Sequence, residues 1–167
     1  MSQPASPESV PAKTPAESRG ELAELMMPQH ANILGKVFGG TLLAMVDKAA
    51  AVAAIRHASR TCVTAQIDRV TFHSPIEIGE LVRCLSMVNW VGRTSLEARV
   101  EVVTENPLRS EPKTTNIGYV VYVAIDANGV PTEVPELIYE TPEQLQRAEQ
   151  AKQRQAYRKQ QRDLEKA

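Results

Sequence analysis

The feature that most constrains this chain is an almost entirely apolar run over residues 41–58, about five helical turns long. Its leucines, alanines, valines and methionine leave no polar face, and a helix that is apolar all round lies inside a structure. The length would also suit a membrane span, but Asp47 and Lys48 stand near the middle and the flanks are polar. The run therefore predicts a buried helix wrapped by a sheet, with no membrane insertion.

Asp47 is the anomaly in this helix. Its neighbours three and four positions away include Leu43, Ala44, Ala50 and Ala51, so the carboxylate projects from an apolar surface. A charge in such a place must be paired, hydrogen-bonded or used, because an isolated buried charge costs several kcal/mol or more. Two interpretations stay open at this point. Asp47 either shares a solvated stripe with Lys48 or is a functional group.

The pair Gly39-Gly40 comes directly before the helix. Two glycines let a ligand approach the backbone without a Cβ in the way. The free N–H groups of the first turn then point at the ligand, where they can bind a phosphate or hold a developing oxyanion. The alternative is that the glycines only make a tight turn. If they bind a ligand, Asp47 stands two turns further along as a group to position or deprotonate a water.

After the helix the hydrophobic period changes from 3.6 to 2. A first strand is expected before the helix, and Gly92-Arg93 is short enough to link two of the later strands as a hairpin. Long strands joined in this way predict a curved antiparallel sheet around one helix, an α+β fold. The expected strands are 21–27, 61–72, 80–91, 94–105 and 116–126.

Length and composition indicate the domain organisation and the expected partners and compartment. The 167 residues suit one domain, here 21–140, between a proline-rich arm at 1–20 that predicts disorder and a polar helix or tail at 141–167. The net charge of −1 attracts neither nucleic acid nor a membrane surface. Two cysteines in apolar runs, and no apolar leader at the start, predict a cytoplasmic protein.

Several catalytic routes lack their sequence signatures. No G-x-S-x-G elbow supports an acyl-enzyme, and Gly35 to Gly40 fits neither a P-loop nor a dinucleotide fingerprint. The three histidines have no metal-ligand spacing with the cysteines. Any hydrolysis is therefore expected to use a carboxylate and water, with no metal and no cofactor.

These residues resemble the acyl-CoA thioesterases of the hotdog fold, and most closely the cytosolic acyl-coenzyme A thioester hydrolases. The resemblance covers about residues 21–140 and rests on an ordered set of short motifs. These are His30-Ala31-Asn32, Gly35, Phe38-Gly39-Gly40, Met45-Val46-Asp47, Val63-Thr64 with Asp68 and Phe72, Pro75-Ile76, Gly79, Gly92-Arg93-Thr94-Ser95 and Val134-Pro135.

The resemblance implies a fold, a substrate and an assembly. The fold is a hotdog, in which a long antiparallel sheet wraps one central helix. The implied substrate is an acyl-CoA thioester, hydrolysed to a free fatty acid and CoA. Paired hotdogs share one continuous sheet, so this single copy is expected to form a homodimer at least, and a trimer of such dimers as a hexamer.

The same resemblance implies roles for particular residues. Asn32 matches the catalytic asparagine and Asp47 the catalytic acid, supplied by opposite subunits. Backbone N–H groups of Gly39 and Gly40 are expected to stabilise the oxyanion, and Thr64 to lie near the attacking water. The CoA side of the groove is assigned to Arg93, Thr94 and Ser95, although Arg93 is equally well an ordinary hairpin charge.

Two rival functions stay open. Hotdog hydratases and dehydratases move protons with a histidine and an acid, but Phe38 stands where an imidazole would be expected. A non-catalytic acyl-CoA sensor would need the thioester to survive beside Asp47. Release of a thiol from acyl-CoA distinguishes both rivals from a thioesterase.

Overall fold

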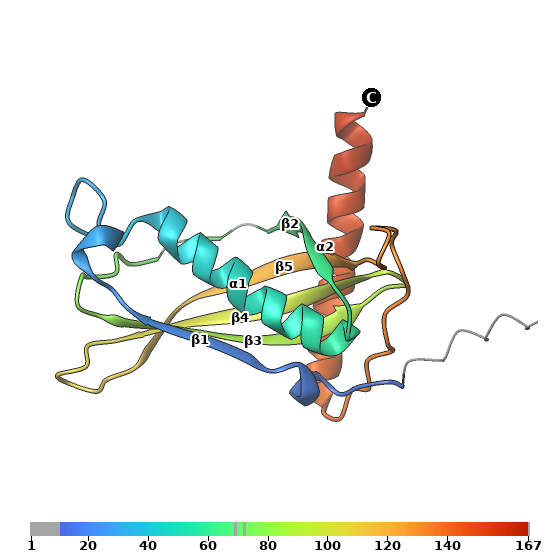
Figure 1. Ribbon diagram of the computed structural model, residues 1–167, viewed down its shortest axis with the longest axis horizontal. Coiled ribbons are helices and arrows are strands. Elements are labelled where there is room, and N and C mark those ends of the chain that lie inside the picture. Colours follow the sequence, from blue (N-terminus) through green and yellow to red (C-terminus); the bar gives the residue numbers. More distant parts are fainter. Residues whose placement is uncertain (1–10, 69, 72, 167) are drawn as a thin grey trace, which may run out of the picture.

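The computed structural model describes residues 11–68, 70–71 and 73–166 and shows one antiparallel sheet around a long helix (Figure 1). The sheet order is β1-β3-β4-β5-β2, so β1 and β2 are its two edges. The main elements are β1 (Gly20–Leu25), α1 (Gly39–Ala58), β2 (Cys62–Ile67), β3 (Leu81–Val91), β4 (Ser95–Glu105), β5 (Lys113–Ala124) and α2 (Pro142–Glu165). Two short 3₁₀ helices are η1 (Pro15–Ser18) and η2 (Pro28–His30).

The core lies between α1 and the concave face of the sheet. From α1 it takes Leu42, Met45 and Val46 and a series of alanines whose small side chains let the helix lie close to the strands. From the strands it takes alternate residues, for example Val82 and Cys84 on β3 and Leu96 and Ala98 on β4. The predicted α+β hotdog architecture is confirmed.

The central helix begins at Gly39, two residues earlier than its apolar run, and ends where Ser59 takes a left-handed conformation at φ 51°. Lys13 supplies the cap at this end. Its Nζ donates to the Arg56 carbonyl and to Ser59 Oγ, both at 2.7 Å. A cation at the C-terminal end of a helix also complements the helix dipole.

Residues 11–20 are packed against the domain, unlike the disordered arm expected from composition; residues 1–10 lie outside the described part. Lys13 bridges to Leu137, and η1 follows with Ser18 fully buried. These contacts could not be predicted from the proline-rich composition, because they are made by one lysine, one serine and backbone groups. None of these produces a hydrophobic period.

The edge strand β2 is shorter than the predicted 61–72. It pairs with β5 from Cys62 to Ile67 and contains a register shift between Thr64 and Gln66. The chain then leaves the ladder at Asp68, whose carboxylate lies 2.6 Å from Arg158 Nη1 on α2. Most of β2 is exposed in the single chain, which leaves one edge of the sheet open.

Helix α2 crosses the outer face of the sheet, opposite α1 (Figure 1). The sequence predicted a solvated helix here, but one stripe is buried and carries charge. Arg154 and Arg158 bind Glu97 of β4, whose side chain is fully buried, and Arg154 also lies 3.7 Å above the Tyr119 ring. Ion pairs, and not large apolar residues, hold this helix to the sheet.

Candidate active site

The Asp47 carboxylate is held by two hydroxyl groups. Asp47 lies on the third turn of α1, and its Oδ1 accepts hydrogen bonds from Thr64 Oγ1 at 2.9 Å and from the Tyr122 hydroxyl at 2.7 Å. The same hydroxyl lies 2.6 Å from the Asp47 main-chain carbonyl oxygen. No described residue donates to Oδ2, so this oxygen remains available to accept a proton.

Sheet pairing explains why the two hydroxyls meet. Thr64 of β2 and Tyr122 of β5 are direct partners in the antiparallel ladder, so their side chains leave the same face of the sheet. That face is covered by α1, which brings Asp47 over both of them. Asp47 is therefore hydrogen-bonded to the sheet and does not share a solvated stripe with Lys48.

Tyr122 is a site residue that sequence analysis missed, because it stands in the nearly apolar run NIGYVVYVAID. Only 1% of it is exposed. Burial, followed by the bond to Asp47, raises its pKa above the ordinary tyrosine value, so the phenol stays protonated and remains a donor. The feature that could have identified Tyr122 is its position opposite Thr64 in the sheet, and that position is known only once the strand register is known.

Asn32 shapes the loop before α1. Its Oδ1 accepts from the backbone N–H groups of Leu34 and Lys36, and Gly35 closes the turn at φ 72°. This use of Oδ1 leaves the amide Nδ2 without a partner among the described residues. Asn32 and Gly39 both line a groove of about 360 Å³, whose opposite wall includes His73 and Pro75.

The groove lies at the start of α1. Phe38 is the N-cap residue but its side chain makes no capping hydrogen bond, and Thr41 N–H is bonded to the Phe38 carbonyl. Gly39 and Gly40 are the first residues of the helix, so their N–H groups have no hydrogen-bond acceptor within the helix. A Cβ on Gly40 would lie 2.3 Å from the Phe38 ring, so this position favours glycine for packing as well.

Asp47 and the glycine pair are too far apart to meet in one chain. Eight residues separate Gly39 from Asp47 within α1, which corresponds to about 12 Å along the helix axis. Asp47 is also absent from the residues that line the Asn32 groove. Within one chain, the Asp47 carboxylate and the glycine N–H groups are therefore not placed around one thioester carbonyl.

Arg93 and Thr94 lie in the β3–β4 hairpin near α2 and the C-terminal end of α1 (Figure 1), and Ser95 begins β4 next to Leu96, which pairs with Tyr122. The Arg93 side chain is 79% exposed, and its guanidinium lies 4.0 Å from Glu133. The carbonyls of Arg93 and Thr94 accept from Val134 and Ala124. None of the three lines the Asn32 groove, and among the described residues none makes a side-chain hydrogen bond to Asp47.

No cluster of three or more His, Cys, Asp or Glu side chains suited to a metal ion occurs in the described part of the chain. Over the same residues, no helix has both the length and the hydropathy of a membrane span.

Comparison with known proteins gives consistent relatives. Residues 34–111 match the model of the thioesterase superfamily. The uncharacterized acyl-CoA thioester hydrolase YkhA of Bacillus subtilis is 35% identical over 77% of this chain and 75% of its own length. The human cytosolic acyl coenzyme A thioester hydrolase is 34% identical over 72% of this chain and 34% of its own length.

Solved structures agree in fold. An acyl-CoA hydrolase from Bacillus cereus superposes with a TM-score of 0.87 at 33% identity, covering 93% of this chain and 94% of its own. An acyl-CoA hydrolase from Staphylococcus aureus, solved with butyryl coenzyme A and coenzyme A, gives 0.86 at 32% identity over 93% and 95%. A hexameric acyl-CoA thioesterase gives 0.86 at 35% identity over 91% and 97%.

Proposed function

The chain belongs to the hotdog-fold acyl-CoA thioesterases of the thioesterase superfamily, and we propose that it hydrolyses acyl-CoA thioesters by direct attack of water. The observation that carries the mechanism is the Asp47 carboxylate, fixed through Oδ1 by Thr64 and Tyr122 while Oδ2 is left to accept a proton. A carboxylate held in this way positions a water and takes its proton as the oxygen attacks the thioester carbon.

The steps balance without a covalent enzyme intermediate. Water adds to the carbonyl carbon, one proton passes to Asp47, and the carbonyl oxygen becomes an oxyanion beside the N–H groups of Gly39 and Gly40. Collapse of this intermediate breaks the carbon–sulfur bond. The sulfur leaves as CoA and takes the proton, and the acyl group leaves as the carboxylic acid. Asn32 Nδ2 holds the water or the thioester.

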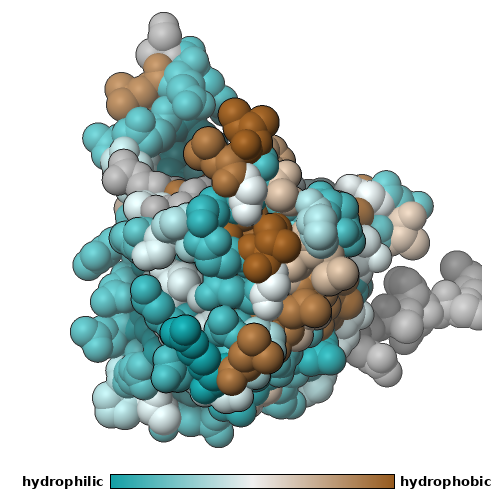
Figure 2. Space-filling model, turned by 90° about the vertical axis from the view of Figure 1, so that its left-hand side faces the viewer, coloured by the Kyte–Doolittle hydropathy of each residue, from teal (hydrophilic) through white to brown (hydrophobic). Residues whose placement is uncertain are grey.

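The site is proposed to form between two copies of the chain, with Asp47 and Thr64 from one and Asn32 and Gly39 from the other. The separation of about 12 Å along α1 supports this arrangement. So does the open edge of β2, where Val63 and Ile67 are exposed and a second sheet can pair. Figure 2 shows apolar surface gathered on the end with the loop before α1, where Ile33, Leu34 and Phe38 are exposed.

Variants of the Staphylococcus aureus hydrolase give further support. Solved structures of that enzyme carry alanine in place of an asparagine, an aspartate or a threonine. The same three residue types recur in this chain, in the same order and with the same spacing, as Asn32, Asp47 and Thr64. The proposed active form of this chain is a homo-oligomer that contains such dimers, with a trimer of dimers as the expected size.

The test is release of CoA thiol from a short, a medium and a long acyl-CoA, followed with a thiol-reactive dye. Asp47→Ala should lower kcat by at least about 100-fold while CoA still binds, because it removes the group that handles the water. Asp163→Ala, which removes an exposed acid on α2, is the matched control and should keep full activity. Near-full kcat in Asp47→Ala would overturn the mechanism.

The protein's own thiols should not disturb this assay. Burial raises the pKa of Cys62 to about 11 and that of Cys84 to about 12, so neither forms the reactive thiolate at neutral pH. Binding of acyl-CoA with no thiol release from the wild type would favour a sensor over an enzyme.

A further inference from the structure

Residues 30–38 form a small hairpin just before α1 (Figure 1). At its base the Phe38 N–H donates to the His30 carbonyl at 2.8 Å, and nearer its tip the Asn32 N–H donates to the opposite arm at 2.7 Å. Gly39 follows directly as the first residue of α1. The hairpin therefore carries the Asn32 amide and leads into the Gly39 N–H, so the place of its base decides where both groups stand.

The two arms of the hairpin are attached to the domain in different ways. On the second arm, the Val37 N–H donates to the Ile76 carbonyl at 2.9 Å, and Lys36 pairs with Glu77 at 2.6 Å. On the first arm, His30 is the only residue, among those the structure describes, whose side chain bonds outside the hairpin. Apart from the 3₁₀ turn η2 that leads into it, this arm is therefore attached through one imidazole.

The His30 imidazole has a partner at each ring nitrogen. Nδ1 accepts the N–H of Met27 at 3.0 Å, and Nε2 lies 3.4 Å from Glu24 Oε1. Because Nδ1 is an acceptor, the neutral ring carries its proton on Nε2, toward the carboxylate. The Glu24 side chain is 46% exposed, so its contact contributes little. The Met27 hydrogen bond is the one that holds the ring.

The chain just before Met27 is held by the sheet. Met26 is 1% exposed, and its N–H and carbonyl both bond to the turn before β3, at 2.8 and 2.7 Å. The next N–H, that of Met27, lies beyond the end of β1 and donates to His30 Nδ1. The imidazole thus links a fixed point beside the sheet to the base of the hairpin.

We propose that His30 is a positioning residue for thioester hydrolysis: its imidazole, bonded to the Met27 N–H, sets where the Asn32 amide and the Gly39 N–H lie relative to the thioester. This role rests on the proposed function. His30 does not line the Asn32 groove, so it acts through the hairpin and not by contact with the substrate. A displacement of about 1 Å can lower a rate about 100-fold, so one hydrogen bond at the hairpin base has a large effect on kcat.

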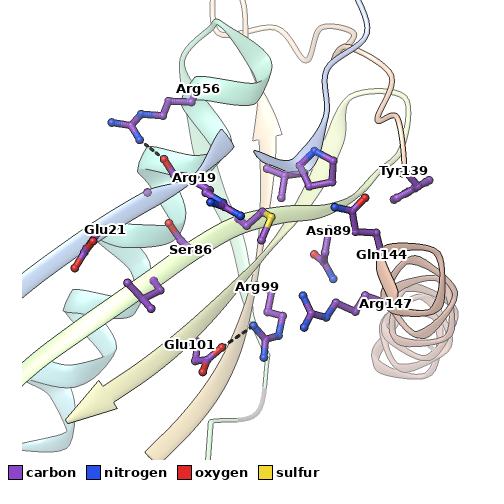
Figure 3. Close-up of a pocket in the computed structure, with 15 residues that line it drawn as sticks. Arg19, Glu21, Arg56, Ser86, Asn89, Arg99, Glu101, Tyr139, Gln144 and Arg147 are labelled. Carbon is purple, nitrogen blue, oxygen red and sulfur yellow. Dashed lines mark hydrogen bonds and ion pairs between the residues drawn. The ribbon is translucent and has the colours of Figure 1, made fainter. Parts of the chain in front are cut away.

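The hairpin is remote from a larger groove, of about 640 Å³, that lies between η1, the end of α1 and the start of α2 (Figure 3). None of the residues 24–39 lines that groove. Substitutions at His30 are therefore expected to leave its walls unchanged, and their effects report on the hairpin.

The test compares two substitutions of nearly equal shape, His30→Asn and His30→Leu. The asparagine Oδ1 is bonded to Cγ, as Nδ1 is, and can accept the Met27 N–H, whereas leucine has no acceptor. His30→Leu should lower kcat for acyl-CoA hydrolysis at least about tenfold with less than about a twofold change in KM, and His30→Asn should stay within about threefold of the wild type. Gln29→Met, at the exposed neighbouring position, is the matched control and should change neither constant.

Mixed oligomers show through which half of the site His30 acts. His30→Leu chains refolded with Asp47→Ala chains should form native sites at about a quarter of the total, because the hairpin of the Asp47→Ala chain is intact. His30→Leu refolded with Asn32→Ala should give no more activity than His30→Leu alone, because both substitutions affect the same half.

Kinetic constants are expressed per folded oligomer, below the melting temperature of each variant, so that lost stability is not counted as lost turnover. Wild-type kcat in His30→Leu would overturn the positioning role and leave the proposed function intact. Equal losses in His30→Leu and His30→Asn would also overturn it, because the acceptor would then have no effect. Recovery with Asn32→Ala in place of Asp47→Ala would do the same. Absence of thiol release from the wild type would instead overturn the proposed function itself.

Discussion

At the scale of single residues, the proposed site depends on the Asp47 carboxylate, which accepts hydrogen bonds from one residue of β2 and one of β5. Thr64 and Tyr122 bind the same oxygen of Asp47, which fixes the rotation of the carboxylate and directs Oδ2 away from the sheet. Tyr122 is the better fixed of the two, because it is buried and also bonds to the backbone of the turn that carries Asp47.

Tyr122→Phe tests this role. It should lower kcat about tenfold, since a hydrogen bond to a charged group contributes roughly 1.5–3 kcal/mol, with little change in KM. Tyr119→Phe, on the outer face of the same strand, should change neither. A variant with wild-type kcat would show that the hydroxyl has no positioning role.

We expect the buried His57 to make the stability of the protein depend on pH. It is fully buried near the end of α1, where Nε2 meets the Pro135 carbonyl at 2.9 Å and Nδ1 has no partner among the described residues. Burial lowers its pKa below the ordinary value of 6.5. The folded protein therefore holds His57 neutral, whereas the unfolded chain takes up a proton once the pH falls below that value.

The free energy of unfolding should accordingly fall as the pH drops below 6.5, by up to about 1.4 kcal/mol per pH unit until the folded pKa is reached. Urea titrations at pH 7.5, 6 and 5 measure it. His57→Gln, which keeps a donor for Pro135 but does not titrate, should show a shallower slope. His73→Gln, at an exposed position, should leave the slope unchanged. Equal slopes for wild type and His57→Gln would contradict the assignment.

At the scale of elements, the C-terminal helix is fixed to the sheet by charge. Arg158 reaches Glu97 at 3.0 Å and Asp68 at 2.6 Å, so it joins α2 to both β4 and the end of β2. Burial opposes the ionised form of Asp68 and raises its pKa, which Arg158 counteracts. The same cluster thus fixes the point at which the chain leaves the edge strand that carries Thr64.

Arg158→Met should destabilise the protein by about 3–5 kcal/mol, because it leaves Asp68 without its ion-pair partner and Glu97 with Arg154 alone. Arg162→Met, one turn on and exposed, should change stability by no more than about 0.5 kcal/mol. Both are measured by urea unfolding at one protein concentration, since assembly contributes to stability. Addition of Glu97→Gln to Arg158→Met should recover part of the loss. A loss below about 1 kcal/mol would show that the ion pairs contribute little.

At the scale of the whole molecule, one chain holds the two halves of the proposed site apart. The Asn32 groove opens at the start of α1, Asp47 lies two turns further on, and the β2 edge beside it is open. Pairing of two copies through this edge would cover the exposed Val63 and Ile67 and bring complementary halves together.

Mixed oligomers test that arrangement. Asn32→Ala and Asp47→Ala chains, each inactive alone, should regain activity when unfolded and refolded together, at about a quarter of all sites for random dimers. Refolded mixtures of Asp47→Ala with Thr64→Ala are the control. Because both substitutions affect the same half of the site, they should recover at most what Thr64→Ala shows alone. No recovery in the first mixture would mean that each site is built from one chain.

The sequence by itself determined the architecture and singled out Asp47 as a carboxylate that needs partners. An all-round apolar helix followed by period-2 strands leaves few ways to bury both, and the sheet wrapped around α1 is the one observed. Asp47 could be selected from the sequence because a charge on an apolar surface needs a partner. Local pattern was sufficient for these predictions because burial and periodicity are properties of single segments.

Only the tertiary structure decided what partners Asp47 has. Tyr122 lies 75 positions away from it, and the contact depends on the strand register, which no local pattern gives. The packed segment 11–20 and the charged attachment of α2 escaped prediction for the same reason: their stabilising contacts are long-range hydrogen bonds and ion pairs, whereas sequence periodicity reports only hydrophobic burial. The separation of Gly39 from Asp47, on which the proposal of a second chain rests, follows from the geometry of α1 once the elements are in place.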